Sequence, residues 1–215
     1  MSMELVLIRH GTSTRSRVGI WGRLYDAPLA EGFEEQLAET RAALESLEQP
    51  KVCSSPLLRC LETASFIFPQ KAVRIIEEFR AYHSGLFEEK TEDFIREHNP
   101  EYVSLSYRDR FLRPNFDEES MEAQTSRVKR GILRVFGDGD PILAIVGHYS
   151  TINIIAHISS LNWETDTYAD GVYDVAEGAF IRKTVDPVTV LAGIRDRIGR
   201  KKPDPPAREG TGGNA

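Results

Sequence analysis

Cysteine is scarce in this chain of 215 residues, which has only Cys53 and Cys60. Two cysteines at this spacing exclude a disulfide-stabilised scaffold and match neither a CxxC redox motif nor a zinc ligand set. Long apolar runs are lacking too. The longest, Ile142–Val146, is far shorter than the roughly 20 residues that cross a bilayer, and Leu5–Ile8 is too short for a signal peptide. We therefore expect a cytoplasmic protein that does not bind a membrane.

An excess of positive charge is also missing. The chain has 27 Lys and Arg against 33 Asp and Glu, which gives a formal net charge of -6. Residues 195–215 carry a net charge of +3, so the body of the chain is more acidic still. Nucleic-acid surfaces need clustered basic residues, so we expect no nucleic-acid partner. The basic tail is either solvated or bound to an acidic partner.

The composition is that of a globular protein, with 40% hydrophobic residues. A chain of this length can bury a core of its own. Nothing divides residues 1–198, so we expect one domain there, followed by a disordered tail over 199–215 that is rich in Pro, Gly, Lys and Arg. The oligomeric state leaves no signal in the sequence.

Short apolar strands alternate with helix-forming segments, which predicts an α/β three-layer sandwich with a mostly parallel central sheet flanked by helices. An antiparallel pair is expected near the end of the chain, with its turn at Asp186-Pro187. Residues 77–117 look irregular and are expected to cross the top of the sheet and shape a pocket. The expected strands are Leu5–Ile8, Lys51–Cys53, Val73–Ile76, Ile142–Val146, Ala179–Val185 and Thr189–Ile194. The expected helices cover 33–48, Leu57–Phe68, 118–136 and Thr151–Ser159.

The candidate functional residues lie where these strands end. Leu5–Ile8 runs into Arg9-His10, and Ile142–Val146 runs into Gly147-His148. A helix that starts with Ser55 as N-cap and Pro56 at its first position places Arg59 in its first turn. If the sheet is parallel, these side chains converge at one edge, where open α/β sheets bind ligands. Such a cationic pocket suits a phosphate group, because guanidinium forks match its oxygens.

Three motifs together resemble the histidine phosphatase superfamily, which has the phosphoglycerate mutase-like fold, in its branch of small phosphatases and mutases. They are Arg9-His10-Gly11-Thr12, the run from Ser54-Ser55-Pro56 to Glu62-Thr63-Ala64, and Val146-Gly147-His148. Weaker matches are Gly22 to Leu29 with Gly32, Gly85 to Thr91, and Glu119-Ser120 before Arg127. The resemblance covers about residues 3–192.

The resemblance implies a role for each of four residues. His10 is the nucleophile that becomes phosphorylated, Arg9 and Arg59 clamp the phosphoryl oxygens, and His148 stabilises the transition state. Phosphoryl transfer needs an in-line nucleophile and dispersed positive charge, which these residues can supply. The sequence shows no carboxylate cluster of the metal-binding kind, so we expect no metal and no cofactor.

Two departures from the family pattern bear on catalysis. The family usually has a proton-donating Glu four residues before the position of Gly85, and this chain has Ala81 there. His83 is a candidate replacement, and it is equally well read as a structural residue; Glu77, Glu78 and Glu88 are the acids nearby. Ser16 stands where the family often has Asn. Its hydroxyl is a candidate phosphate ligand.

The leading hypothesis is a metal-independent phosphatase for a small phosphorylated metabolite. Phosphoglycerate mutase-type phosphoryl transfer is one alternative. A second is a non-catalytic phosphate-binding protein, which the missing acid at Ala81 suggests. A third is hydrolysis of a phosphoramidate or acyl phosphate, whose good leaving group needs no proton donor.

Overall fold

A computed structural model describes residues 2–20, 25–105, 117–136, 139–162, 167–168 and 171–198. Its centre is a five-stranded sheet with the strand order β3-β2-β4-β1-β7. The inner pairs are parallel, and β7 at the edge runs antiparallel to β1. The strands are β1 (Met3–Arg9), β2 (Lys51–Ser54), β3 (Val73–Ile75), β4 (Ile142–Gly147) and β7 (Phe180–Val185). Strands β5 (Leu161–Asn162) and β6 (Thr167–Tyr168) form a separate ribbon.

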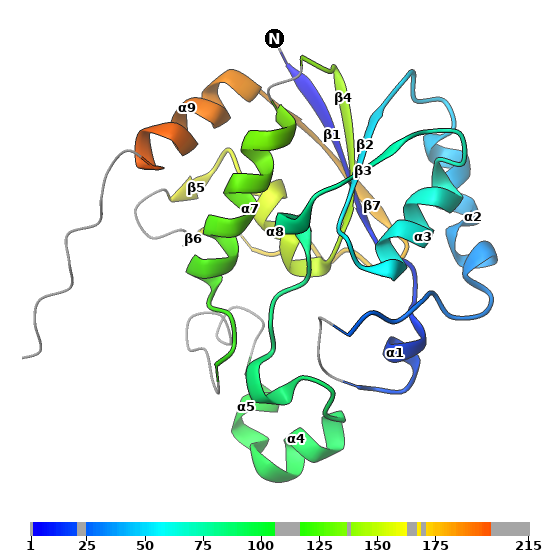
Figure 1. The fold of residues 1–215 in the computed structure, drawn as a ribbon, viewed down its shortest axis with the longest axis vertical. Helices are drawn as coiled ribbons and strands as arrows, with labels where there is room; N and C mark the ends of the chain where they lie inside the picture. Colours follow the sequence, from blue (N-terminus) through cyan, green and yellow to red (C-terminus); the bar gives the residue numbers. More distant parts are fainter. Residues whose placement is uncertain are drawn as a thin grey trace, which may run out of the picture.

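Helices cover both faces of the sheet (Figure 1). Along β1, Val6 and Ile8 pack against one helical layer, and Leu5 and Leu7 pack against the other. This alternation is what a strand buried on both faces requires. The predicted three-layer α/β fold is therefore confirmed. One layer is α2 (Phe33–Leu44) and α3 (Leu58–Ile67); the other is α7 (Met121–Val135), α8 (Tyr149–Ala156) and α9 (Pro187–Ile198).

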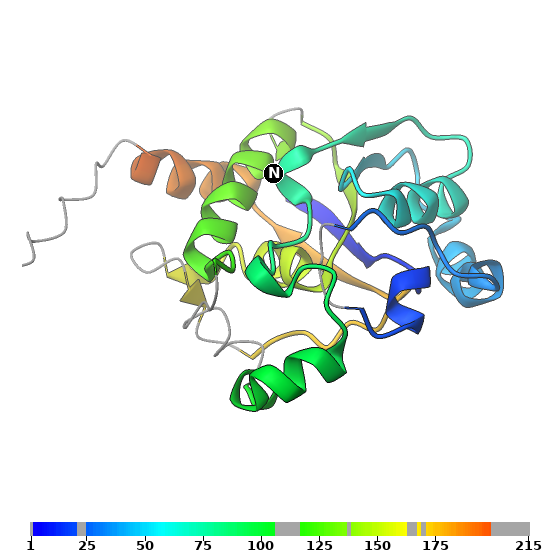
Figure 2. The same ribbon diagram turned by 60° about the horizontal axis from the view of Figure 1, so that its bottom comes forward.

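The prediction of an irregular segment over 77–117 was wrong for its described part. It contains two 3₁₀ turns and two short helices; the first turn packs on α7, and the two helices lie beyond the carboxyl ends of the parallel strands (Figures 1 and 2). Thr91 and Asn99 cap the two helices through their side chains, and the segment has a small apolar cluster of its own. Short capped helices carry too little periodicity to be seen in a sequence. The turns are η1 (Glu77–Phe79) and η2 (Gly85–Phe87), and the helices are α4 (Glu92–His98) and α5 (Pro100–Ser104).

The expected strand over Thr189–Ile194 was also wrong, because these residues form part of α9. Asp186 Oδ1 accepts a hydrogen bond from the Val188 backbone at 3.2 Å, which starts a helix rather than a hairpin turn. Val190 and Ile194 are both buried, and their four-residue spacing is that of one helix face. Strand β7 pairs with β1 instead.

Several helix boundaries differ from the expected ones by two to four residues. At α3 the difference matters, because the helix starts at Leu58, so that Ser55 and Pro56 precede it. The tail over 199–215, which was expected to be disordered, and the motif residues 22–24 lie outside the described residues. Among the described helices, none has the length and apolar character needed to cross a membrane.

Candidate active site

The two histidines lie side by side at the carboxyl edge of the sheet. His10 follows β1, and His148 follows β4 as the N-cap residue of α8. The strands are parallel, with Arg9 opposite Gly147, so the next residue of each strand emerges at the same level. The ring centroids are 5.2 Å apart, and both side chains are buried. The structure thus brings together two residues that lie far apart in the sequence, as the strand endings predicted.

Arg59 bridges the two imidazoles. It lies in the first turn of α3 and is fully buried. Its Nε donates to His10 Nε2 at 3.3 Å, and its Nη2 lies 3.3 Å from His148 Nδ1. A guanidinium can only donate hydrogen bonds, so both ring nitrogens that it faces must act as acceptors.

These contacts define the tautomer of His10. Its Nδ1 lies 2.7 Å from the carbonyl oxygen of Gly11, which can only accept, so Nδ1 carries the proton. The lone pair is then on Nε2, facing Arg59. Burial, and after it the charges of Arg59, Arg9 and Arg15, hold the pKa of His10 well below its ordinary value of 6.5. A neutral imidazole with its lone pair beside a guanidinium is suited to nucleophilic attack on phosphorus.

Ser55 orients His148. Its Oγ lies 2.8 Å from His148 Nε2. Since His148 Nδ1 accepts from Arg59, its proton is on Nε2 and is donated to Ser55. The sequence interpretation had assigned Ser55 to helix capping and missed this contact. The proximity of the two strand ends, β2 and β4, was the signal that could have found it.

Arg9 and Ser16 meet at a residue that the sequence interpretation missed, Glu177. The guanidinium of Arg9 donates to the Val175 carbonyl at 2.8 Å and to Glu177 Oε1 at 3.4 Å, and it lies over the Tyr149 ring. The Ser16 hydroxyl donates to the same Glu177 oxygen at 2.9 Å. Both predicted phosphate ligands therefore bind a carboxylate in this structure, and their predicted role stays a prediction.

The position of the usual proton donor holds no acid. Ala81 is buried and has no proton to give. His83 is half-buried, and its Nδ1 accepts from the Gly85 backbone at 3.1 Å, so its proton is on Nε2. Its role as a proton donor stays a prediction.

The three acidic residues near Ala81 in the sequence are either exposed or bound to other groups. Glu77 is exposed, and Glu78 forms an ion pair with Arg134 at 3.0 Å. Glu88 accepts from the Ser84 backbone at 2.7 Å. Over the part of the chain that the structure describes, no group of three His, Cys, Asp or Glu is placed to hold a metal ion.

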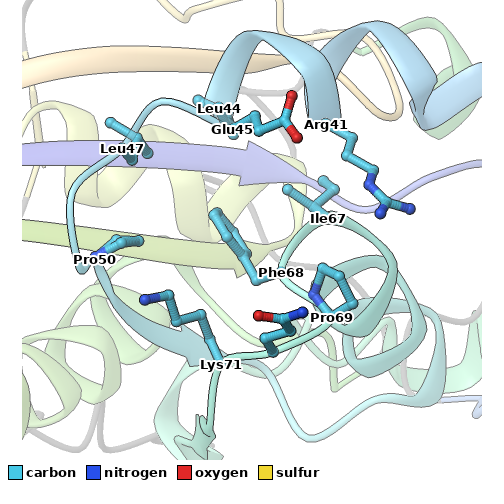
Figure 3. Close-up of a pocket in the computed structure, with 10 residues that line it drawn as sticks. Arg41, Leu44, Glu45, Leu47, Pro50, Ile67, Phe68, Pro69 and Lys71 are labelled. Atoms are coloured by element: carbon cyan, nitrogen blue, oxygen red, sulfur yellow. The ribbon is translucent and has the colours of Figure 1, made fainter.

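Two cavities differ in their relation to these residues. A cavity of about 420 Å³ borders the histidine cluster, because it is lined by Tyr25, whose carbonyl accepts from Arg59, and by Arg15, whose charge acts on His10. Its other described lining residues are Thr14, Val18, Ile20 and Glu89. A cavity of about 270 Å³ lies between the ends of α2 and α3 near the start of β2, with Phe68 and Pro50 in its wall and no histidine (Figure 3). Neither cavity has His10, Arg9, Arg59 or His148 among its described lining residues, so the site is assigned from these four residues, and the first cavity is the one that adjoins a contact of Arg59.

Comparisons with known proteins identify a family and a fold. The family model described as histidine phosphatase superfamily (branch 1) matches residues 5–170. A mycobacterial glucosyl-3-phosphoglycerate phosphatase has a similar structure, with a TM-score of 0.71 and 20% identity over 86% of this chain and 91% of that chain. The α-ribazole phosphatase of Shigella flexneri aligns with a TM-score of 0.68 and 23% identity, over 84% and 89% of the two chains. Among curated proteins, none matches this sequence. At these identities the structural likenesses establish the fold.

Proposed function

The chain belongs to the histidine phosphatase superfamily, and we propose that it hydrolyses a small phosphoric monoester through a phosphohistidine on His10. The observation that carries this proposal is the pair of contacts of the His10 ring. Its Nδ1 proton is held by the Gly11 carbonyl, so its Nε2 lone pair faces Arg59 in a cationic site.

In the first step, His10 Nε2 attacks phosphorus, the Nε2–P bond forms, and the bond from phosphorus to the ester oxygen breaks. The imidazole becomes cationic, and the hydrogen bond from Nδ1 to the Gly11 carbonyl strengthens as it does so. In the second step, water attacks the same phosphorus and releases inorganic phosphate and neutral His10. One difficult displacement is thereby divided into two easier ones.

Arg59 and Arg9 are proposed to spread the negative charge of the phosphoryl oxygens. Arg59 already contacts His10, so a small rotation of its guanidinium would let it donate hydrogen bonds to the phosphoryl oxygens. His148 is proposed to stabilise the transition state from the opposite side of Arg59. Donation by His148 to a phosphoryl oxygen needs a proton on Nδ1, which a dianion nearby favours. These groups supply the required charge without a metal, so we propose metal independence.

The leaving oxygen needs a proton unless it is a good leaving group. We propose that His83 supplies this proton as an imidazolium: the ring takes a second proton from solvent on Nδ1, which breaks the contact with the Gly85 N–H, and it returns to the neutral form when Nε2 donates to the leaving oxygen. The buried Ala81 favours a second candidate function, in which the site binds a phosphorylated ligand without turnover.

The substrate is proposed to be a small metabolite. The cavity beside the histidines has room for a small leaving group, and similar folds belong to phosphatases named for α-ribazole and glucosyl-3-phosphoglycerate. Cys53 and Cys60 are buried thiols, which suits the reducing cytoplasm that we propose as the protein's location.

The test is a screen of phosphorylated metabolites for phosphate release, run with and without EDTA. We expect turnover of one class of monoester that EDTA does not reduce. Tight binding of phosphorylated ligands with no release from any of them would support the non-catalytic function instead. Loss of activity in EDTA would contradict metal independence.

A further inference from the structure

Glu177 binds two side chains that are predicted to bind phosphate, Arg9 and Ser16. Its Oε1 accepts from Ser16 Oγ at 2.9 Å and from Arg9 Nη2 at 3.4 Å. The proposed function assigns Arg9 to the phosphoryl group, and the sequence predicts Ser16 as a further phosphate ligand. The Glu177 side chain is 20% exposed and that of Arg9 is 23% exposed, so this ion pair lies at the mouth of the site rather than in the core.

We propose that Glu177 competes with the ligand anion for Arg9 and Ser16, and that it thereby weakens the binding of inorganic phosphate, the product. The proposal rests on the proposed function, in which Arg9 binds the phosphoryl group, and on the predicted role of Ser16 as a phosphate ligand. An incoming dianion must displace the carboxylate from the two donors or lie beside it, and like charges at such distances repel. In either case the anion loses affinity.

The backbone at Glu177 cannot move away with its side chain. The Gly178 N–H donates to the His10 carbonyl at 2.9 Å, and the Thr40 hydroxyl donates to the Gly178 carbonyl at 2.7 Å. Gln36 Nε2 donates to the Glu177 carbonyl at 3.0 Å. Gly178 has a φ of 83°, in the left-handed region that favours glycine. The carboxylate can therefore leave the donors only by rotating its side chain toward solvent.

Arg9 has supports that do not depend on Glu177. Its Nη1 donates to the Val175 carbonyl at 2.8 Å, and its guanidinium lies 5.3 Å from the centroid of the Tyr149 ring. When the carboxylate swings out, these contacts keep Arg9 at the site. Glu177 thus acts as a competitor of the ligand, and the orientation of Arg9 comes from its other neighbours.

Product and substrate differ in the contacts that they can make beyond the phosphoryl group. An ester gains additional contacts for its leaving group in the cavity that Tyr25 and Arg15 line, whereas inorganic phosphate has no such group. A carboxylate beside the phosphoryl site weakens the binding of both ligands, and inorganic phosphate has no leaving-group contacts to offset this loss. The expected consequence is weak product inhibition.

The test measures the affinity of the full chain for inorganic phosphate by titration calorimetry. We expect Glu177→Gln, which keeps the shape and removes the charge, to bind phosphate about tenfold more tightly than the wild type or better. Glu177→Ala should change the affinity in the same direction. The control is Glu39→Gln, which removes the same charge from an exposed position on α2 and should leave the affinity unchanged.

Whether Glu177→Gln raises or lowers the affinity for phosphate decides whether the proposal holds. Equal or weaker binding by Glu177→Gln would overturn the proposal, because it would mean that the carboxylate positions Arg9. Absence of measurable binding to both proteins would also count against it. The readout needs no turnover, so it is independent of the phosphatase proposal. Tighter phosphate binding by Glu177→Gln, with no phosphohistidine formed by the wild type, would support the role of Glu177 and contradict hydrolysis. Equal or weaker phosphate binding by Glu177→Gln, with a phosphohistidine formed by the wild type, would overturn the role of Glu177 and support hydrolysis.

Discussion

Arg59 Nε donates to His10 Nε2 across 3.3 Å, while the other nitrogen of that ring lies 2.7 Å from the Gly11 carbonyl. The guanidinium therefore faces the one atom of His10 that can attack phosphorus. Burial, and after it the charge of this guanidinium, holds the pKa of His10 well below its ordinary value, which favours the neutral ring. In the proposed mechanism, a single side chain from α3 thus prepares the nucleophile that follows β1.

Replacement of Arg59 should slow phosphoryl transfer strongly. We expect Arg59→Ala to lower kcat by about 10²- to 10³-fold, as removal of one preorganised donor does elsewhere. Arg59→Lys should restore only part of the rate, because an ammonium cannot contact two groups through a fork. Steady-state kinetics on the best substrate measure both. Wild-type activity in Arg59→Lys would contradict the bridging role of the guanidinium.

The absence of an acid at position 81 should affect how strongly the hydrolysis rate depends on the pKa of the leaving group. If His83 donates the proton, rates for a series of phosphate esters should depend weakly on leaving-group pKa, and His83→Ala should make the dependence steep. Alkyl esters should then lose about 10²-fold and aryl esters much less, because acidic phenols leave without a proton.

Ala81→Glu is the matched gain-of-function variant. In a site without a donor, the wild type should show a steep dependence and Ala81→Glu should raise the rates of alkyl esters by up to about 10²-fold. A shallow dependence that neither variant alters would place the donor elsewhere, with Glu77, Glu78, Glu88 or the substrate as the remaining sources.

The low pKa of His10 should also make the free energy of unfolding depend on pH. In the unfolded chain this group titrates near 6.5, and in the folded chain it titrates well below that value. As the pH falls below 6.5, the unfolded state binds a proton that the folded state does not, so the free energy of unfolding decreases. We expect the wild type to lose up to about 1.4 kcal/mol per pH unit more than His10→Gln in this range. Urea unfolding at several pH values measures this, and parallel curves for the two proteins would refute the assignment.

A buried ion pair should hold the segment that carries His83. Arg127 binds Glu119 at 2.6 and 2.9 Å and donates to the carbonyls of Glu78 and Arg80. We expect Arg127→Met to lower the free energy of unfolding by about 3 kcal/mol, because it leaves Glu119 and these carbonyls without their donor. Arg130→Met on the exposed side of the same helix should change it by less than about 0.5 kcal/mol. Similar losses in the two variants would contradict the role of the pair.

Much of this architecture could be predicted because local signals agreed with tertiary structure. The runs Leu5–Ile8 and Ile142–Val146 are apolar throughout, as strands covered on both faces must be, and a histidine follows each run within two residues. The convergence of His10, Arg59 and His148 followed from that parallel arrangement. The chemical roles of these residues remain predictions.

The parts that could not be predicted depend on contacts between distant residues or on weak local signals. In 189–194 the β-branched residues suggested a strand, but the start of the helix at Asp186 and the spacing of Val190 and Ile194 prevailed. Glu177 could be placed at the site only once β7 was known to pair with β1. Because the partner of β7 was predicted wrongly, this carboxylate went unnoticed.

The most direct test of the account is to trap the intermediate on His10. The protein is mixed with a labelled substrate, quenched, and digested under conditions that preserve phosphohistidine, and the label is located by mass spectrometry. The account predicts an acid-labile phosphoryl group on His10 in the wild type, and neither label nor phosphate release in His10→Ala. Full phosphate release by His10→Ala, or label on another residue, would contradict it.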